Sequence, residues 1–239
     1  MRSIPALNPL LLLTFVFASP ANDSAATTIV ADSVAEFSGE QGRDGWQYGF
    51  YDGDLPAPFT PVDFEPFPQF DGERWLIQDG PGSYWTELSA KQAHPNGYTT
   101  SGGRLSADHW AVRRWVSDSA GLHSISGVLA DFSRFPGSLP TVNGVIGHVI
   151  IDGAELLKLP IHDGESTTYS FTANLDVGST VDFALDARPV SPVSTRTVDF
   201  SDWTTFTAQV ALIPEPSAAI ACTVGLCLAQ FALRRTRCQ

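Results

Sequence analysis

The chain has 239 residues, of which 43% are hydrophobic, and it carries a formal net charge of −12 at pH 7. A chain of this length can form one domain with a self-sufficient core. Its negative charge repels polyanions at long range, so we expect no binding to nucleic acid.

The first 26 residues have the composition of a secretory signal peptide. Arg2 supplies a positive charge, Leu10–Ala18 is a short apolar stretch, and small residues follow. This order is typical of a leader that signal peptidase removes, and the apolar stretch is too short to span a membrane. The small residues at 19–21 and at 24–26 both suit the peptidase, so two cleavage positions stay open. We expect residues 1–26 to be absent from the mature domain.

Residues 27–212 contain many short segments with the alternating pattern of β-strands. In Thr180–Asp186, for example, Val181, Phe183 and Leu185 fall on one face, which is the signal of a half-buried strand. No amphipathic helix of ten or more residues is present. The pattern predicts an all-β sandwich or barrel. The strand candidates are Trp46–Tyr51, Tyr84–Leu88, Ala111–Val116, Ser124–Ala130, Gly144–Asp152, Leu156–Leu159, Thr168–Ala173, Thr180–Asp186 and Thr205–Leu212.

Two carboxylates flank a glycine directly after the first of these candidates, at Asp52 and Asp54. Hard oxygen ligands in a loop suit Ca²⁺, so a structural calcium ion is a secondary hypothesis. The pattern falls short of a twelve-residue calcium loop, and an exposed turn is the favoured alternative. We expect no other cofactor.

The segment Leu55–Phe70 differs from its surroundings because it holds five prolines and four phenylalanines. Prolines exclude it from a regular central strand, so we expect a long loop. Its phenylalanines indicate that this loop packs against another part of the domain.

Aromatic and polar residues in loops are the candidate ligand contacts. An aromatic ring can stack on the apolar face of a sugar while neighbouring polar groups bind its hydroxyls. Trp46, by contrast, is expected in the core. The candidates are Trp75 and Trp85 around a Gly-Pro-Gly turn, His94, Asn96 and Tyr98 in a second turn, and Trp110 before a strand.

Adjacent arginines follow Trp110, at Arg113 and Arg114. Neighbouring residues of a strand point to opposite faces, so at most one arginine faces solvent. A buried arginine needs a carboxylate partner, and a structural ion pair is favoured over a ligand role. His148 lies in another strand candidate, where a packed sheet histidine is favoured over a metal ligand.

Catalytic signatures are absent from the expected mature segment. It has no cysteine nucleophile, no Gly-x-Ser-x-Gly elbow, no zinc-binding His-Glu-x-x-His and no P-loop. Its many carboxylates leave a glycosidase pair open, because sequence does not give their separation. We expect a protein that is not an enzyme.

The C-terminal segment, residues 213–239, has three parts in order. Pro214-Glu215-Pro216 comes first, then an apolar run at 218–233, then the basic residues Arg234, Arg235 and Arg237. The run would span about 24 Å as a helix, short for a bilayer core, and the arginines would hold its end in the cytoplasm. An ordinary tail anchor is one interpretation of this short transmembrane helix.

The same layout resembles the PEP-CTERM sorting signal of exosortase-processed bacterial proteins. This resemblance implies recognition at the Pro-Glu-Pro tripeptide, removal of the helix, and delivery to the cell surface or its polysaccharide matrix. Phe37–Asp52 is similar to the start of secreted β-sandwich domains found beside such tails, and Gly178–Asp186 resembles a strand of carbohydrate-binding jelly rolls. Together they imply a jelly-roll-like antiparallel β-sandwich at 27–212.

The favoured function is a non-catalytic module at the cell surface or in the extracellular matrix that binds carbohydrate or exopolysaccharide. A structural or adhesive matrix protein without a small-glycan site is the first alternative. A glycan-active hydrolase or lyase is the second.

Overall fold

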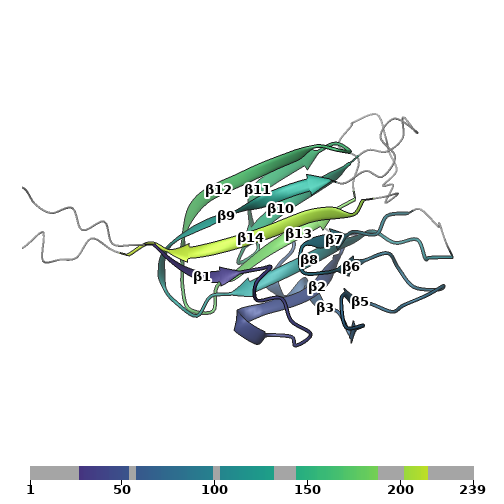
Figure 1. Cartoon of the computed structure of the whole chain (residues 1–239), viewed down its shortest axis with the longest axis horizontal. Coiled ribbons are helices and arrows are strands. Elements are labelled where there is room, and N and C mark those ends of the chain that lie inside the picture. Colours follow the sequence, from purple (N-terminus) through teal and green to yellow (C-terminus); the bar gives the residue numbers. More distant parts are fainter. Residues whose placement is uncertain (1–26, 54–57, 99–102, 132–143, 188–201, 215–239) are drawn as a thin grey trace, which may run out of the picture.

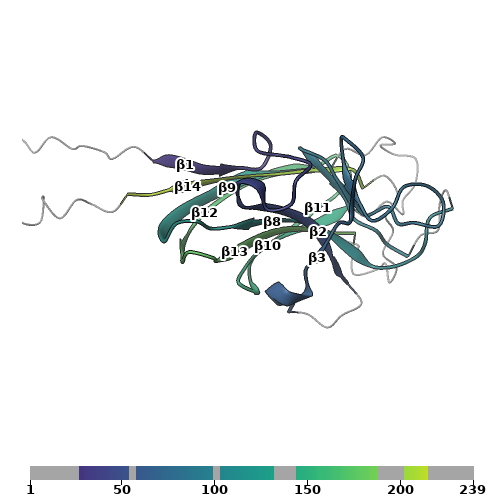
Figure 2. The same cartoon turned by 90° about the horizontal axis from the view of Figure 1, so that it is seen from below.

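Two antiparallel sheets form a β-sandwich in the computed structural model, which describes residues 27–53, 58–98, 103–131, 144–187 and 202–214 (Figures 1 and 2). The sheet that we call the large sheet contains β1 (Thr28–Asp32), β4 (Gln69–Phe70), β5 (Trp75–Leu76), β6 (Glu87–Leu88), β7 (Gln92–His94), β9 (Gly121–Asp131), β12 (Ser166–Leu175) and β14 (Thr204–Leu212). The small sheet contains β2 (Trp46–Asp52), β3 (Glu65–Pro66), β8 (His109–Val116), β10 (Val145–Ile151), β11 (Ala154–Ile161) and β13 (Thr180–Asp186). The helical elements of the described part are two single 3-10 turns, η1 (Arg43–Gly45) and η2 (Pro61–Asp63).

The strand order is that of a jelly roll. The large sheet runs β12-β9-β14-β7-β6-β5-β4, with β1 also paired to β14, and the small sheet runs β11-β10-β13-β8-β2-β3. From β8 to β14 the chain changes sheet at every connection except the β10–β11 hairpin. This wrapping sets β1, β14, β9 and β12 against β8, β13, β10 and β11. The predicted all-β antiparallel sandwich is confirmed.

The core lies between the two sheets, where the alternating strands place their apolar residues. Val181, Phe183 and Leu185 of β13 are buried there, as their pattern predicts, and so are Trp46 and Tyr48 of β2. Trp46 donates its indole N–H to the Glu36 carboxylate, at 2.8 Å, so its polar atom is satisfied. These small-sheet side chains pack in one apolar cluster with Ile125, Leu129 and Phe206 of the large sheet.

The outer face of the small sheet is also covered. Phe59 stacks on Tyr51 of β2 with ring centroids 4.6 Å apart, and it meets Trp110 of β8 edge-on at 4.8 Å. Phe64 lies against the Arg114 guanidinium at 4.2 Å. The described part of the Pro- and Phe-rich segment therefore packs against the sandwich, as its phenylalanines indicate.

Most predicted strands are present in the structure. Eight of the nine candidates correspond to β2, β8, β9, β10, β11, β12, β13 and β14, whereas Tyr84–Leu88 is a strand only at Glu87–Leu88, in β6. The pattern did not reveal β1 or the short strands β3, β4, β5 and β7.

Several expectations fall outside the described residues. They include the leader at 1–26, Asp54, and the tail from Glu215 onward, with its apolar run and arginines. Within the described ranges, no helix has the length and apolar composition needed to cross a bilayer.

Candidate functional site

Within the described residues, the outer face of the large sheet differs from that of the small sheet because two open grooves lie on it. On β12, Thr168, Ser170 and Thr172 alternate outward and are exposed, while Tyr169 is buried between the sheets. The polar residues Ser124 and Ser126 of β9 and Thr205, Thr207 and Gln209 of β14 are partly exposed, and Val128 of β9 is 37% exposed. The open face is therefore built mainly from short hydroxyl and amide side chains, with Val128 among them.

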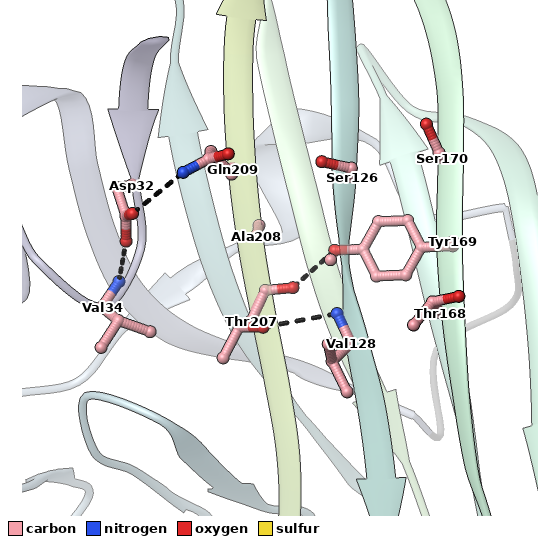
Figure 3. A pocket seen from close by; sticks show the side chains of 11 residues that line it. Asp32, Val34, Ser126, Val128, Thr168, Tyr169, Ser170, Thr207, Ala208 and Gln209 are labelled. Carbon is pink, nitrogen blue, oxygen red and sulfur yellow. Dashed lines mark hydrogen bonds between the residues drawn. The ribbon is translucent and has the colours of Figure 1, made fainter.

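A groove of about 580 Å³ lies on this face across β1, β14, β9 and β12 (Figure 3). We call it the hydroxyl groove. Its polar side chains belong to Asp32, Ser126, Thr168, Ser170, Thr207 and Gln209. Because hydroxyls and amides both donate and accept hydrogen bonds, this lining matches a neutral ligand rich in hydroxyl groups.

Asp32 fixes one wall of the hydroxyl groove. Its Oδ1 accepts hydrogen bonds from the backbone N–H of Val34 and of Ala35, both at 3.0 Å, and its Oδ2 accepts one from Gln209 Nε2 at 3.3 Å. Burial would raise the pKa of Asp32, but these hydrogen bonds outweigh burial and lower the pKa. The carboxylate is thus held ionised, and it orients the Gln209 amide (Figure 3).

The floor of the groove depends on a glycine. Tyr169 donates its hydroxyl to the Thr207 carbonyl at 2.8 Å, across β9. A Cβ at Gly127 would lie 1.9 Å from that carbonyl oxygen and 2.5 Å from the tyrosine oxygen. Only a residue without a side chain fits at this position, so Gly127 lets the tyrosine reach across β9 from the inner side of the sheet.

A second groove, of about 700 Å³, lies beside the first, and we call it the phenylalanine groove. It is lined by the half-buried rings of Phe37 and Phe70, whose centroids are 6.2 Å apart, together with Ser38, Gln92 and Thr205. Thr205 lines this groove and Thr207 lines the hydroxyl groove. Since alternate residues of a strand share a face, both grooves lie along the outer face of β14.

Four of the six predicted ligand residues are buried. Trp75 donates its indole N–H to the Ser38 carbonyl at 2.8 Å and stacks on Tyr48. Trp110 stacks on His148 at 4.3 Å, which confirms His148 as a packed sheet histidine. Trp75 thus belongs to the core between the sheets, whereas Trp110 is buried beneath Phe59 on the outer face of the small sheet.

The turn that holds His94 and Asn96 is packed as well. His94 lies between the rings of Trp85 and Trp203. Asn96 is fully buried: its side-chain oxygen accepts from the backbone N–H of Trp85 at 2.8 Å, and its side-chain nitrogen donates to the Ala107 carbonyl at 2.7 Å. These bonds give both residues a structural role in the turn.

Trp85 and Tyr98 are the predicted ligand residues with accessible side chains. Trp85 is half-buried beneath the Arg104 guanidinium, 4.6 Å from its ring centroid, and Tyr98 is 48% exposed. Neither lines the hydroxyl or the phenylalanine groove. A ligand role for these two residues stays a prediction.

Sequence reasoning missed the residues that line both grooves. Phe37 lies in the segment that resembles the start of secreted β-sandwich domains, and Phe70 lies in the predicted loop. The outward Ser and Thr residues of β9, β12 and β14 appear in the sequence only as the polar positions of alternating strands. The signal was the uniformity of that polar half, which on β12 is Ser166, Thr168, Ser170, Thr172 and Asn174.

Possible metal ligands occur in two places. Asp52 ends β2 and is half-buried, and its predicted partner Asp54 is outside the described residues. A group that sequence reasoning did not anticipate consists of Asp131, Asp163 and Asp202, at one end of the large sheet.

Comparison with known proteins identifies no family for this chain. No protein-family model and no curated protein matches it. Among solved structures it is similar to a family 35 carbohydrate binding module from Clostridium thermocellum, with 12% identity, 44% of this chain and 77% of that chain covered, and a TM-score of 0.26. It is also similar to a carbohydrate binding module from Cellvibrio mixtus lichenase 5A in complex with cellotriose, with 13% identity, 77% and 97% covered, and a TM-score of 0.27. Rabbit GITRL gives the same TM-score, 0.27, with 12% identity and 72% and 97% covered. TM-scores this low do not identify a function.

Proposed function

We propose that this protein is an exported, non-catalytic β-sandwich module that binds neutral carbohydrate along the outer face of its large sheet. The observation that carries the proposal is the contrast between the two outer faces. The small sheet is covered by Phe59 and Phe64, whereas the large sheet presents two adjoining grooves.

The chemistry of the two grooves matches a sugar polymer. The hydroxyl groove offers donors and acceptors from Ser126, Thr168, Ser170 and Gln209. The phenylalanine groove adds half-buried rings, which can stack on the apolar face of a pyranose. The net charge of −12 favours a neutral glycan over an anionic one.

A binding role is favoured over hydrolysis by the carboxylates present. Each groove has one carboxylate in its described lining, Asp32 in the hydroxyl groove and Glu73 in the phenylalanine groove. Glycoside hydrolysis commonly uses two, about 5–10 Å apart on either side of the bond. Asp32 is moreover held ionised by its hydrogen bonds, so it is poorly suited to act as a general acid.

The C-terminal segment supplies the proposed destination. Its Pro-Glu-Pro tripeptide, apolar run and terminal arginines support sorting by an exosortase, after export through the N-terminal leader. The module would then reach the cell surface or its polysaccharide matrix, where glycan is the abundant ligand. Processing of the tail is the measurement that tests this destination.

A glycan-binding screen tests the proposed ligand. We expect the full-length chain, purified in mild detergent, to bind at least one neutral glycan in a panel that also contains acidic glycans. Thr168→Ala and Gln209→Ala remove hydrogen-bonding groups from the hydroxyl groove, so each should weaken that binding about 3- to 10-fold. Affinity is measured by titration calorimetry with the best glycan of the panel.

Thr172→Ala is the matched control. Thr172 is exposed on the same strand as Thr168 but does not line the groove, so its replacement should leave affinity unchanged. Silence across all neutral glycans would favour a structural or adhesive matrix role instead. Binding that Thr168→Ala, Gln209→Ala and Thr172→Ala all leave intact would place the ligand elsewhere on the molecule.

A further inference from the structure

Three neighbouring strands bring aspartates together at one end of the large sheet. Asp131 is the last residue of β9, and it pairs with Thr204, the first residue of β14. Asp202 precedes Thr204 by two residues. On the other side of β9, Ala130 pairs with Ser166, the first residue of β12, and Asp163 lies in the turn before it. The strand register therefore places the three carboxyl groups together at this end of the large sheet.

The oxygens of the three carboxyl groups lie close enough together to share one ion. One oxygen from each of Asp131, Asp163 and Asp202 lies within 4.8 Å of the others. Two oxygens bound to one Ca²⁺ at 2.3–2.6 Å are at most about 5 Å apart. The arrangement thus has the dimensions of a coordination sphere without any rearrangement of the strands.

Asp131 gives an independent reason to expect a cation. Its side chain is 3% exposed, and within the described part of the chain neither of its carboxylate oxygens has a hydrogen-bond donor. A buried carboxylate without a partner is strongly unfavourable, so folding favours a positive charge at this position.

We propose that Asp131, Asp163 and Asp202 bind a hard divalent cation, with Ca²⁺ as the preferred ion. All three side chains offer oxygen, which Ca²⁺ binds with six to eight ligands, and carboxylates can supply one or two oxygens each. The group contains no histidine or cysteine, which zinc prefers. The ion would join the ends of β9, β12 and β14 and so stabilise that end of the sandwich.

The cation site is separate from the proposed carbohydrate face. The groove residues of β9 are Ser126–Val128, several positions before Asp131. Loss of the ion should therefore lower thermal stability without removing any groove residue. A negative glycan screen would leave the proposal of a cation site standing.

Calcium-dependent melting of the full-length chain tests the site. We expect Ca²⁺ to raise the melting temperature by about 5–10 °C over EDTA, when free Ca²⁺ is about 100 times its dissociation constant. Calorimetric titration with CaCl₂ should give one site per chain. Asp131→Asn and Asp163→Asn should each reduce Ca²⁺ affinity at least 10-fold, whereas the matched control Asp52→Asn should not.

The variants also separate a metal site from a purely structural acidic cluster. Asn keeps the size of Asp and removes charge repulsion, so in EDTA the Asp131→Asn protein should melt no lower than the wild type. Asp163 lies in a turn and is only half-buried, so its variant keeps the test decisive if Asp131→Asn fails to fold. A wild-type melting temperature that ignores Ca²⁺, or a Ca²⁺ response that survives Asp131→Asn and Asp163→Asn, would overturn the proposal. A response to Mg²⁺ equal to that of Ca²⁺ would overturn the choice of ion.

Discussion

At the residue scale, the two adjacent arginines of β8 show how a buried charge is held. Arg114 forms a bidentate pair with Asp182, with Nε–Oδ1 at 2.6 Å and Nη2–Oδ2 at 2.9 Å. Tyr51 donates its hydroxyl to the same carboxylate, and burial together with Asp182 raises the pKa of Tyr51. The favoured structural ion pair is therefore present, beneath Phe64.

Removal of Arg114 should destabilise the protein strongly. Arg114→Met leaves Asp182 buried without its cation, which is expected to lower the free energy of unfolding by about 3–5 kcal/mol. Denaturant unfolding followed by tryptophan fluorescence measures the change. Arg43→Met is the matched control, because Arg43 is exposed and 3.7 Å from Asp44, and its loss should change stability by less than about 0.5 kcal/mol.

The double variant identifies the cause. Asp182→Asn removes the stranded charge and still accepts the Tyr51 hydroxyl, so Arg114→Met with Asp182→Asn should be more stable than Arg114→Met alone. If the double variant is less stable than either single variant, lost packing rather than an uncompensated charge explains the effect.

Arg113 shows the limit of sequence reasoning at this scale. The alternation predicts that Arg113 and Arg114 face opposite ways, and they do, but it also predicts a carboxylate for each buried arginine. Arg113 is 2% exposed and donates instead to the carbonyls of Ser89, at 2.7 Å, and Ser33, at 3.3 Å. Burial lowers the pKa of Arg113 to about 10. Backbone acceptors from distant segments leave no signature in a sequence.

At the element scale, the segment after residue 57 determines which face of the sandwich is available. Phe59 covers Tyr51 and Trp110, and Pro61 accepts a hydrogen bond from Arg114 Nη1 at 2.9 Å. The outer face of the small sheet therefore behaves as a second core, which buries Ile150 of β10, while Val145, Val149 and Ile151 are buried in the core between the sheets. The proposed ligand binding therefore falls on the large sheet.

Phe59→Ala should remove much of this cover. The ring is 3% exposed, and deletion of a buried aromatic side chain is expected to lower the free energy of unfolding by about 3–5 kcal/mol. Val62→Ala, in the same segment, is the matched control because Val62 is 88% exposed and should contribute less than about 0.5 kcal/mol. Thermal and denaturant unfolding measure both changes. Equal effects of the two variants would show that the segment is not an integral part of the fold.

Long strands could be predicted from the sequence because their alternation is repeated several times. The short strands β3, β4, β5 and β7 have only two or three residues, which is too few to show an alternating pattern. They form because they can pair with neighbouring strands from other parts of the chain. The grooves depend on the same long-range pairing. The sequence shows Thr168 and Gln209 as polar strand residues, but only the strand order places them in one groove.

At the scale of the whole molecule, both ends of the domain leave from the same side of the sandwich. Thr28 of β1 pairs with Leu212 of β14, and Figures 1 and 2 show these strand ends side by side. Thr204, which pairs with Asp131 of the proposed cation site, lies eight residues before Leu212, about 27 Å along the strand. The proposed cation site would thus lie at the end of the sandwich far from the point where the tail begins, and the grooves would lie between the two.

The proposed sorting signal depends on its Pro-Glu-Pro tripeptide. Glu215 is the acidic centre of the Pro-Glu-Pro tripeptide, so Glu215→Ala should prevent processing and leave the full-length chain in the membrane of a host that has an exosortase. Immunoblots of membrane and medium, with mass spectrometry of the C-terminus, measure the outcome. Ser217→Ala, directly after the tripeptide, is the matched control and should be processed as the wild type is. Release of the Glu215→Ala protein at the normal rate would contradict exosortase sorting and favour an ordinary tail anchor or another route of release.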